Sequence, residues 1–95
     1  MGPKTKELIE VLDRLVQMLD EDGQEHWRDW MSQARTRTWL LESDFNGIEK
    51  VLLAYGGMGS FNDIYISKLT RKNDCFSALR TRAWELATEI KHGQE

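Results

Sequence analysis

Residues 5–20, with the sequence TKELIEVLDRLVQMLD, decide the fold of this 95-residue chain. Leucines recur in this stretch at intervals of four, three and four residues, which places them in one stripe along an α-helix. Other aliphatic residues widen the stripe to about half of the helix circumference. The stripe consists of Leu8, Leu12, Leu15 and Leu19, widened by Ile9, Val11, Val16 and Met18. We therefore expect an amphipathic helix that packs on a core along its whole length and ends near Asp22, where Gly23 can adopt a positive φ.

A second apolar stripe predicts a helix over residues 24–38. Two tryptophans fall on the core face of this helix together with smaller side chains. The residues of the stripe are Trp27, Trp30, Met31, Ala34 and Thr38. Trp39 lies off that face, so either the helix ends before it or Trp39 packs against a later element.

Two more helices are expected, over residues 44–55 and from a cap near Asn73 to about residue 91. In the first of them, Asn46 and Glu49 have the spacing of a capping box, and Gly56 stands where a left-handed glycine ends many helices. The apolar stripe of this helix is Ile48, Val51, Leu52 and Tyr55. The apolar stripe of the last helix is Phe76, Leu79, Ala83, Leu86, Ala87 and Ile90.

A glycine-rich turn separates these two helices, and glycine's freedom at positive φ suits a sharp connection. The predicted structural turn consists of Gly56, Gly57, Gly59, Ser60, Asn62 and Asp63. It lacks the lysine of a phosphate-binding loop and follows a helix instead of a strand. Ser60 and Asp63 have capping-box spacing, so we expect a short helix that continues to Leu69. The run Ile64-Tyr65-Ile66 leaves a short strand as the alternative, although such a strand has no evident mate.

These elements predict an all-α fold, a compact single-domain bundle of four to five helices that spans residues 1–95, with flexible ends at about 1–4 and 92–95. Pro3, the one proline, is expected to lie outside any element. Hydrophobic residues make up 40% and charged residues 31% of the chain, a globular balance that argues against disorder. The longest apolar runs are far shorter than the ~20 residues of a membrane span. Because there is no apolar leader segment and only one cysteine, Cys75, we expect a cytoplasmic protein.

No residue pattern indicates a metal site, a cofactor site or a catalytic group. A calcium-binding loop that started at Asp20 would need glycine and glutamate at the positions of Glu25 and Met31. The soft zinc ligands, which share no ligand-like spacing, are Cys75, His26 and His92. Acidic residues lie near His26, but no nucleophile accompanies it. The sequence therefore predicts a protein that is not an enzyme and holds neither metal nor cofactor.

Charge is distributed unevenly along the chain, although the formal net charge is only −3. Acidic residues dominate the first helix and its end, and basic residues dominate positions 65–82. The basic residues are Lys68, Arg71, Lys72, Arg80 and Arg82. Packing of an acidic helix beside a basic one would account for this pattern, and so would two oppositely charged binding surfaces.

Acidic residues clustered at the junction of the first two helices are the predicted partner-binding surface, because clustered charge accelerates association with a basic partner. This acidic corner consists of Asp20, Glu21, Asp22, Glu25 and Asp29. Trp39 and Trp84 are added to the partner-binding residues, since helical periodicity buries neither of them and exposed tryptophan commonly anchors protein interfaces.

The middle of the chain, from about residue 25 to 66, resembles a family of small uncharacterised bacterial proteins. The resemblance rests on His26-Trp27-Arg28-Asp29-Trp30, on Asp44-Phe45, and most specifically on the Gly-Gly-Met-Gly-Ser-aromatic-Asn-Asp turn at residues 56–63. Such proteins are similar in size and acidity to the immunity proteins of bacterial toxin systems. The resemblance implies no active-site residues.

The expected function is that of a bacterial immunity protein, a protein-binding module that neutralises a toxin by covering a basic active surface. One alternative is a small enzyme or ligand-binding protein that uses the turn at residues 56–63. Another is a nucleic-acid-binding regulator that uses the basic C-terminal helices, although the nearly neutral overall charge argues against it. A membrane partner is not expected, and the sequence leaves homodimerisation open.

Overall fold

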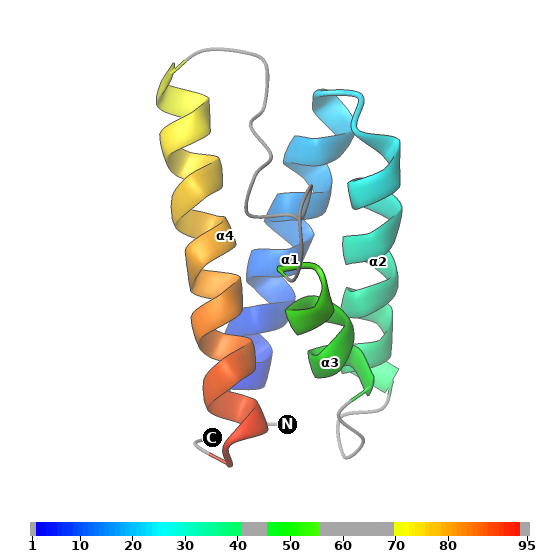
Figure 1. Cartoon of the computed structure of the whole chain (residues 1–95), viewed down its shortest axis with the longest axis vertical. Helices are drawn as coiled ribbons and strands as arrows, with labels where there is room; N and C mark the ends of the chain where they lie inside the picture. The colour runs from blue at the N-terminus through cyan, green and yellow to red at the C-terminus, as the bar shows by residue number, and fades with distance from the viewer. Residues whose placement is uncertain (1, 41–45, 56–69, 94–95) are drawn as a thin grey trace.

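Four α-helices dominate the residues that this computed structural model describes, which are 2–40, 46–55 and 70–93. In chain order the helices are α1 (Pro3–Glu21), α2 (Glu25–Leu40), α3 (Asn46–Leu53) and α4 (Thr70–Lys91) (Figure 1). These ranges contain no strand, and the predicted all-α bundle is confirmed. The expected short helix ending at Leu69 and the alternative strand Ile64-Tyr65-Ile66 lie outside the described residues.

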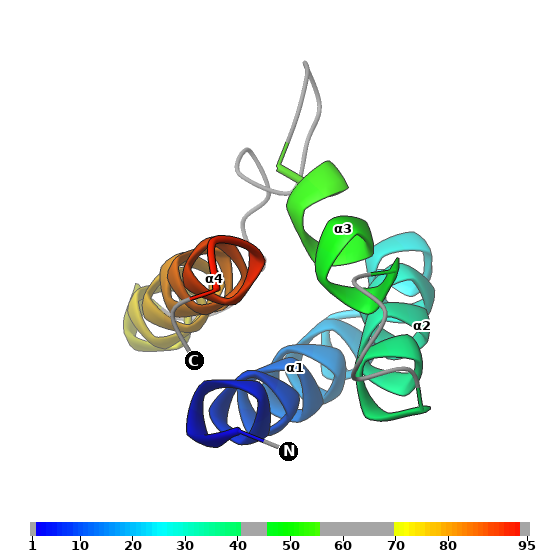
Figure 2. The same ribbon diagram turned by 90° about the horizontal axis from the view of Figure 1, so that it is seen from below.

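The helices form a ring in which α1 lies opposite the short helix α3. α1 packs against α2 and α4, and α3 packs against the same two helices. Both α2 and α4 run antiparallel to α1, so the beginning of α1 and the end of α4 lie at the same end of the bundle (Figure 1). Seen along the bundle, α3 occupies the side away from α1 (Figure 2). Because α3 has 8 residues and α4 has 22, α3 covers only part of the length of its neighbour.

The leucine stripe of α1 forms the centre of the core, as its spacing predicts. Leu8, Leu12, Leu15 and Leu19 are each 0% exposed. Opposing side chains come from Met31 and Ala34 of α2, Ile48 and Val51 of α3, and Phe76, Ala83, Leu86, Ala87 and Ile90 of α4. Complete burial of one leucine side chain contributes roughly 1.5–3 kcal/mol relative to exposure, so the stripe is a major source of stability.

A Schellman turn ends α1 and directs the chain sharply into α2. The Gly23 N–H donates to the Asp20 carbonyl oxygen at 3.1 Å, and the Gln24 N–H donates to the Leu19 carbonyl oxygen at 2.9 Å. Gly23 has a φ of +74°, a conformation that costs a residue with a side chain about 1–2 kcal/mol. The predicted role of Gly23 is confirmed.

Four helix boundaries differ from the expectations, and one of them is the end of α3, which lies at Leu53 instead of residue 55. Pro3 is the first residue of α1 instead of lying outside it, and proline fits there because the first turn of a helix needs no donor from it. Trp39 belongs to α2 although it lies off the apolar stripe. α4 begins at Thr70, so the cap predicted near Asn73 is wrong and Asn73 lies inside the helix. The first turn of α4 is polar, and periodicity of apolar residues therefore starts this helix too late.

Two side-chain hydrogen bonds fasten α3 and its end to the neighbouring helices. Trp30 Nε1–H of α2 donates to the Lys50 carbonyl oxygen at 2.9 Å, and Lys50 Nζ lies 4.1 Å from the centroid of the Trp30 ring. Just after α3, the Tyr55 hydroxyl donates to the Arg80 carbonyl oxygen of α4 at 2.6 Å. Burial raises the pKa of Tyr55, so its hydroxyl stays protonated and remains a donor at neutral pH.

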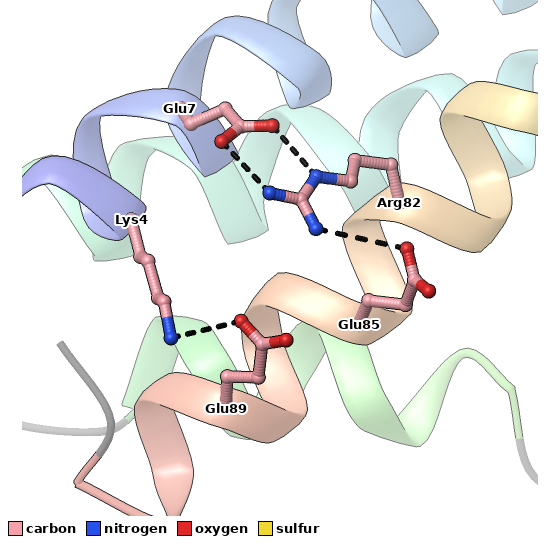
Figure 3. Close-up of polar contacts among 5 residues, drawn as sticks. All are labelled: Lys4, Glu7, Arg82, Glu85 and Glu89. Atoms are coloured by element: carbon pink, nitrogen blue, oxygen red, sulfur yellow. Dashed lines mark hydrogen bonds and ion pairs between the residues drawn. The ribbon is translucent and has the colours of Figure 1, made fainter.

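Ion pairs join the first turns of α1 to the second half of α4 (Figure 3). Arg82 donates from Nε to one carboxylate oxygen of Glu7 at 2.7 Å and from Nη2 to the other at 2.9 Å. Arg82 Nη1 also lies 3.7 Å from Glu85, and Lys4 Nζ lies 3.0 Å from Glu89. Packing of an acidic helix beside a basic one therefore accounts for the charges of Glu7 and Arg82.

Candidate functional site

The structure gathers the acidic corner at the connection between α1 and α2. Asp20 and Glu21 are the last residues of α1, and Asp22 is its C-cap. Glu25 is the first residue of α2, and Asp29 lies one turn further on. Asp22 is half-buried and the other four residues are exposed. The Schellman turn thus brings together five carboxylates that come from two different helices.

Arg28 also lies at the acidic corner, a position that its place in the sequence does not predict. Its Nη1 is 2.8 Å from Asp20 Oδ1, and its Nη2 is 3.1 Å from Asp29 Oδ1. The hydrogen bond to Asp20, followed by that to Asp29, raises the pKa of Arg28. Helical periodicity places Arg28 on the polar face of α2 but does not show that it reaches the end of α1. The signal that could have found this contact is the short turn at Gly23, which sets the first turn of α2 beside the last turn of α1.

Two glutamine side chains donate hydrogen bonds to the carboxylates of the acidic corner. Gln24 Nε2 donates to Asp22 Oδ2 at 2.8 Å, and Gln17 Nε2 donates to Glu21 Oε1 at 3.4 Å. An amide is neutral, so these bonds satisfy acceptor atoms without cancelling charge. With five carboxylates and the guanidinium of Arg28, the acidic corner keeps a negative charge and is suited to binding a cationic group.

Three of the five carboxylates stand at the unfavourable end of a helix. The C-terminus of α1 is the negative end of its dipole, and the last turn contains no basic residue. Asp20, Glu21 and Asp22 therefore each destabilise this end by about 0.3–1 kcal/mol at low ionic strength. Glu25, in the first turn of α2, is placed favourably. The helix dipoles therefore oppose the charges at the end of α1 and favour the charge at the start of α2.

Trp84 is exposed but lies far from the acidic corner. Its exposed fraction is 46%, in agreement with its position off the apolar stripe of α4. Two contacts of α4 with the first turns of α1 lie on either side of Trp84 in the chain: Arg82 contacts Glu7, and Glu89 contacts Lys4. Trp84 is therefore level with the first turns of α1. The corner lies at the other end of α1, which has 19 residues and is thus roughly 28 Å long. The predicted partner-binding residues therefore do not form one surface.

Two other predicted features fall outside the part of the chain that the structure describes. One is the side chain of Trp39, of which only the backbone position in α2 is described. The other is the predicted turn, formed by Gly56, Gly57, Gly59, Ser60, Asn62 and Asp63. The turn therefore stays a prediction, as does any site built on it.

The described members of the basic set do not form an exposed face. Arg80 is only 9% exposed, and its Nη2 donates to Ser77 Oγ at 3.1 Å. The guanidinium of Arg82 is held by Glu7. Phosphate binding requires cationic side chains that are accessible and can release counterions. The observed positions of Arg80 and Arg82 do not favour that role.

Within the described ranges, no group of three or more His, Cys, Asp and Glu side chains could hold a metal ion. The ring of His26 instead packs against tryptophans. Its centroid lies 4.9 Å from that of Trp27 in an edge-to-face arrangement and 6.1 Å from that of Trp30. His26 thus belongs to an aromatic cluster at the start of α2.

Comparison with known proteins relates the sequence to a family without an assigned function. No curated protein and no solved structure matches the chain. In the described residues, no helix combines the length and apolarity that crossing a membrane requires. Residues 20–74 match the family described as Domain of unknown function (DUF6966). The match covers more than half of the chain and begins at Asp20, the first residue of the acidic corner. This chain belongs to the DUF6966 family.

Proposed function

We propose that this protein is a bacterial immunity-type protein that binds a toxin and covers its basic active surface with the acidic corner. The observation that supports the proposal is the crowding of five carboxylates around one short turn, four of them on exposed residues. Such a cluster creates a local negative field, which attracts a basic protein surface before contact.

The helix dipole favours only part of this arrangement. Like charges repel one another across the turn, and three of them oppose the dipole of α1. Arg28 compensates part of this repulsion through its pairs with Asp20 and Asp29. A basic partner would compensate the rest of the repulsion between the carboxylates. The same repulsion that destabilises the free protein would therefore favour the complex.

The acidic corner is also held in a fixed geometry. The two backbone hydrogen bonds of the Schellman turn fix the path of the chain, and Arg28 of α2 bonds Asp20 of α1. Carboxylates that are already ordered lose little conformational freedom on binding. A rigid acidic surface is therefore suited to blocking an active surface that is itself rigid and basic.

The test uses the protein encoded by a toxin-like gene next to the gene of this chain. Reversing Asp22 and Glu25 to lysine (D22K/E25K) should slow association with that protein at least about tenfold at low salt. The same double variant should protect cells less well in a growth assay. Stopped-flow mixing measures the association rate, and circular dichroism verifies that the variant is folded.

A matched control reverses two carboxylates away from the acidic corner. Glu10 in the middle of α1 and Glu85 on α4 are exposed, and E10K/E85K changes the net charge by the same amount. The proposal expects this control to associate nearly as fast as the wild type. Equal slowing by both double variants would show that only net charge matters. A neighbouring toxin that does not bind the wild type would contradict the immunity function itself.

A further inference from the structure

Two large apolar side chains remain exposed among the residues whose burial the structure describes. Leu53, the last residue of α3, is 67% exposed, and Trp84 of α4 is 46% exposed. The core already takes up the apolar stripe of each helix. Neither side chain is therefore explained by the packing of the bundle.

Leu53 borders a groove between α3 and α4. The groove has a volume of about 380 Å³ and is lined by Glu49, Leu52 and Leu53 of α3 and by Lys91 of α4. Trp84 precedes Lys91 by seven residues, which is close to two helical turns, so both project from the same side of α4. We refer to Glu49, Leu52, Leu53, Trp84 and Lys91 as the α3–α4 seam.

We propose that the α3–α4 seam is the contact surface of a homodimer in which two copies of the chain pair about a two-fold axis. Such a contact requires a surface that complements itself. The seam has an exposed leucine, Leu53, beside a hollow, and it has an acid, Glu49, on one wall and a base, Lys91, on the other. In the dimer, Leu53 of each copy enters the groove of the other, and Glu49 of each copy faces Lys91 of the other.

The charge of the seam favours a second copy over a strongly charged partner. One carboxylate and one ammonium group balance there, whereas a basic protein or a nucleic acid would leave one of them opposite a like charge. Lys91 lies at the end of α4, which is also the end where α1 begins (Figure 1). The acidic corner lies at the other end of α1, so its negative charge is not part of the contact and the dimer leaves it free.

The dimer is expected to be weak. A standard stable interface buries roughly 800 Å² on each partner, about a seventh of the 5770 Å² surface of this chain. The apolar part of the seam consists of three side chains, Leu52, Leu53 and Trp84. Because so few apolar side chains make the contact, we expect a dissociation constant on the order of micromolar.

The first experiment is sedimentation equilibrium of the full chain from roughly 5 to 500 µM, a range that brackets the expected constant. The wild type should pass from monomer to dimer, and Leu53→Asp should raise the dissociation constant at least about tenfold, because a charged side chain that must be desolvated would replace the apolar contact in the groove. Ala78→Asp is the matched control. Ala78 is exposed on α4 and lies about 120° around the helix from Trp84, so this variant should dimerise as the wild type does.

The second experiment tests the reciprocal ion pair. Glu49→Lys and Lys91→Glu should each be monomeric alone, because each variant places like charges together twice in its own dimer. An equimolar mixture of E49K and K91E should form a heterodimer, in which both contacts again join opposite charges. If Glu49 paired with Lys91 of its own chain, mixing the two variants would restore no ion pair. A heterodimer in the mixture therefore requires the pair to form between two chains.

Circular dichroism and thermal melting are recorded for every variant, and all four should remain folded because each replaced residue is exposed or lies on the rim of the groove. A wild type that stays monomeric across the whole range overturns the proposal. So does a wild-type dimer that is insensitive to L53D, or a mixture of E49K and K91E that remains monomeric.

Discussion

Arg82 binds Glu7 through two parallel hydrogen bonds of 2.7 and 2.9 Å, although 75 positions separate the two residues in the chain. The contact connects the second turn of α1 with the middle of α4 (Figure 3). Bidentate geometry of this kind is the strongest form of an arginine–carboxylate pair. The pair shows how α4 is displaced along α1, because it sets Glu7 and Arg82 at the same level of the bundle.

The Glu7–Arg82 pair predicts a specific pH dependence of stability. The hydrogen bond from Arg82 holds the pKa of Glu7 below its usual range. A carboxyl whose pKa is lowered by folding stabilises the folded state above its unfolded pKa, and this contribution is lost as the pH falls through the folded pKa. Glu7→Gln should therefore destabilise the protein at about pH 6, and the difference from the wild type should shrink towards about pH 3.

The measurement is the free energy of unfolding by urea, at several pH values, for the wild type and for Glu7→Gln. Glu10→Gln serves as the control, because Glu10 is an exposed carboxyl on the same helix. A difference between Glu7→Gln and wild type that is the same at pH 6 and pH 3 would show that Arg82 does not stabilise the charged form of Glu7. Both side chains are partly exposed, so the effect is expected to be modest.

Gly23→Ala should lower the free energy of unfolding by about 1–2 kcal/mol. Gly23 has a φ of +74°, and no heavy atom lies within 4 Å of the position that a Cβ would take. The expected loss is therefore backbone strain alone, without a steric clash. Thermal or urea unfolding measures it.

Gly93→Ala provides the comparison for that variant. Gly93 has nearly the same φ, +76°, and equally open surroundings, but it follows the last turn of α4, where local fraying can relieve strain. Its substitution should cost clearly less than that of Gly23. Equal losses at the two sites would mean that the turn between α1 and α2 frays as readily as the end of α4.

Arg28→Gln tests how the acidic corner attracts a basic partner. Removing the guanidinium makes the corner more negative, so association with the toxin of the proposed function should become roughly two- to fivefold faster at low salt. Stability should change little, because Arg28 forms exposed ion pairs that solvent screens. Stopped-flow mixing at two salt concentrations measures the effect. Slower association would instead show that Arg28 is needed to hold Asp20 and Asp29 in place.

The buried faces of the helices were predictable, because burial imposes a period on the sequence. Every leucine of the α1 stripe is fully buried, and Phe76 and Leu86 occupy the core face of α4 as expected. A helical turn without an apolar side chain adds nothing to this period, so the period cannot show that the turn is helical. This is why the apolar pattern places the start of α4 near Asn73 instead of at Thr70.

The acidic corner was predictable because its residues lie within ten positions of one another, so a single short turn brings them together. Contacts between distant segments were not predictable in the same way. A helical wheel gives the face of a residue but not the rotation or the displacement of one helix against another. The pairing of Arg82 with Glu7 and the distance between Trp84 and the acidic corner both depend on that displacement.

The ion pair between Lys4 and Glu89, in which Nζ and Oε2 lie 3.0 Å apart, has a consequence for immobilising the protein on a support. It holds the start of α1 and the end of α4 side by side at one pole of the bundle (Figure 1). A linker attached at the start of α1 or at the end of α4 would therefore hold the protein by the same end of the bundle. The molecule would then be displayed in a single orientation, with the acidic corner at the pole furthest from the support.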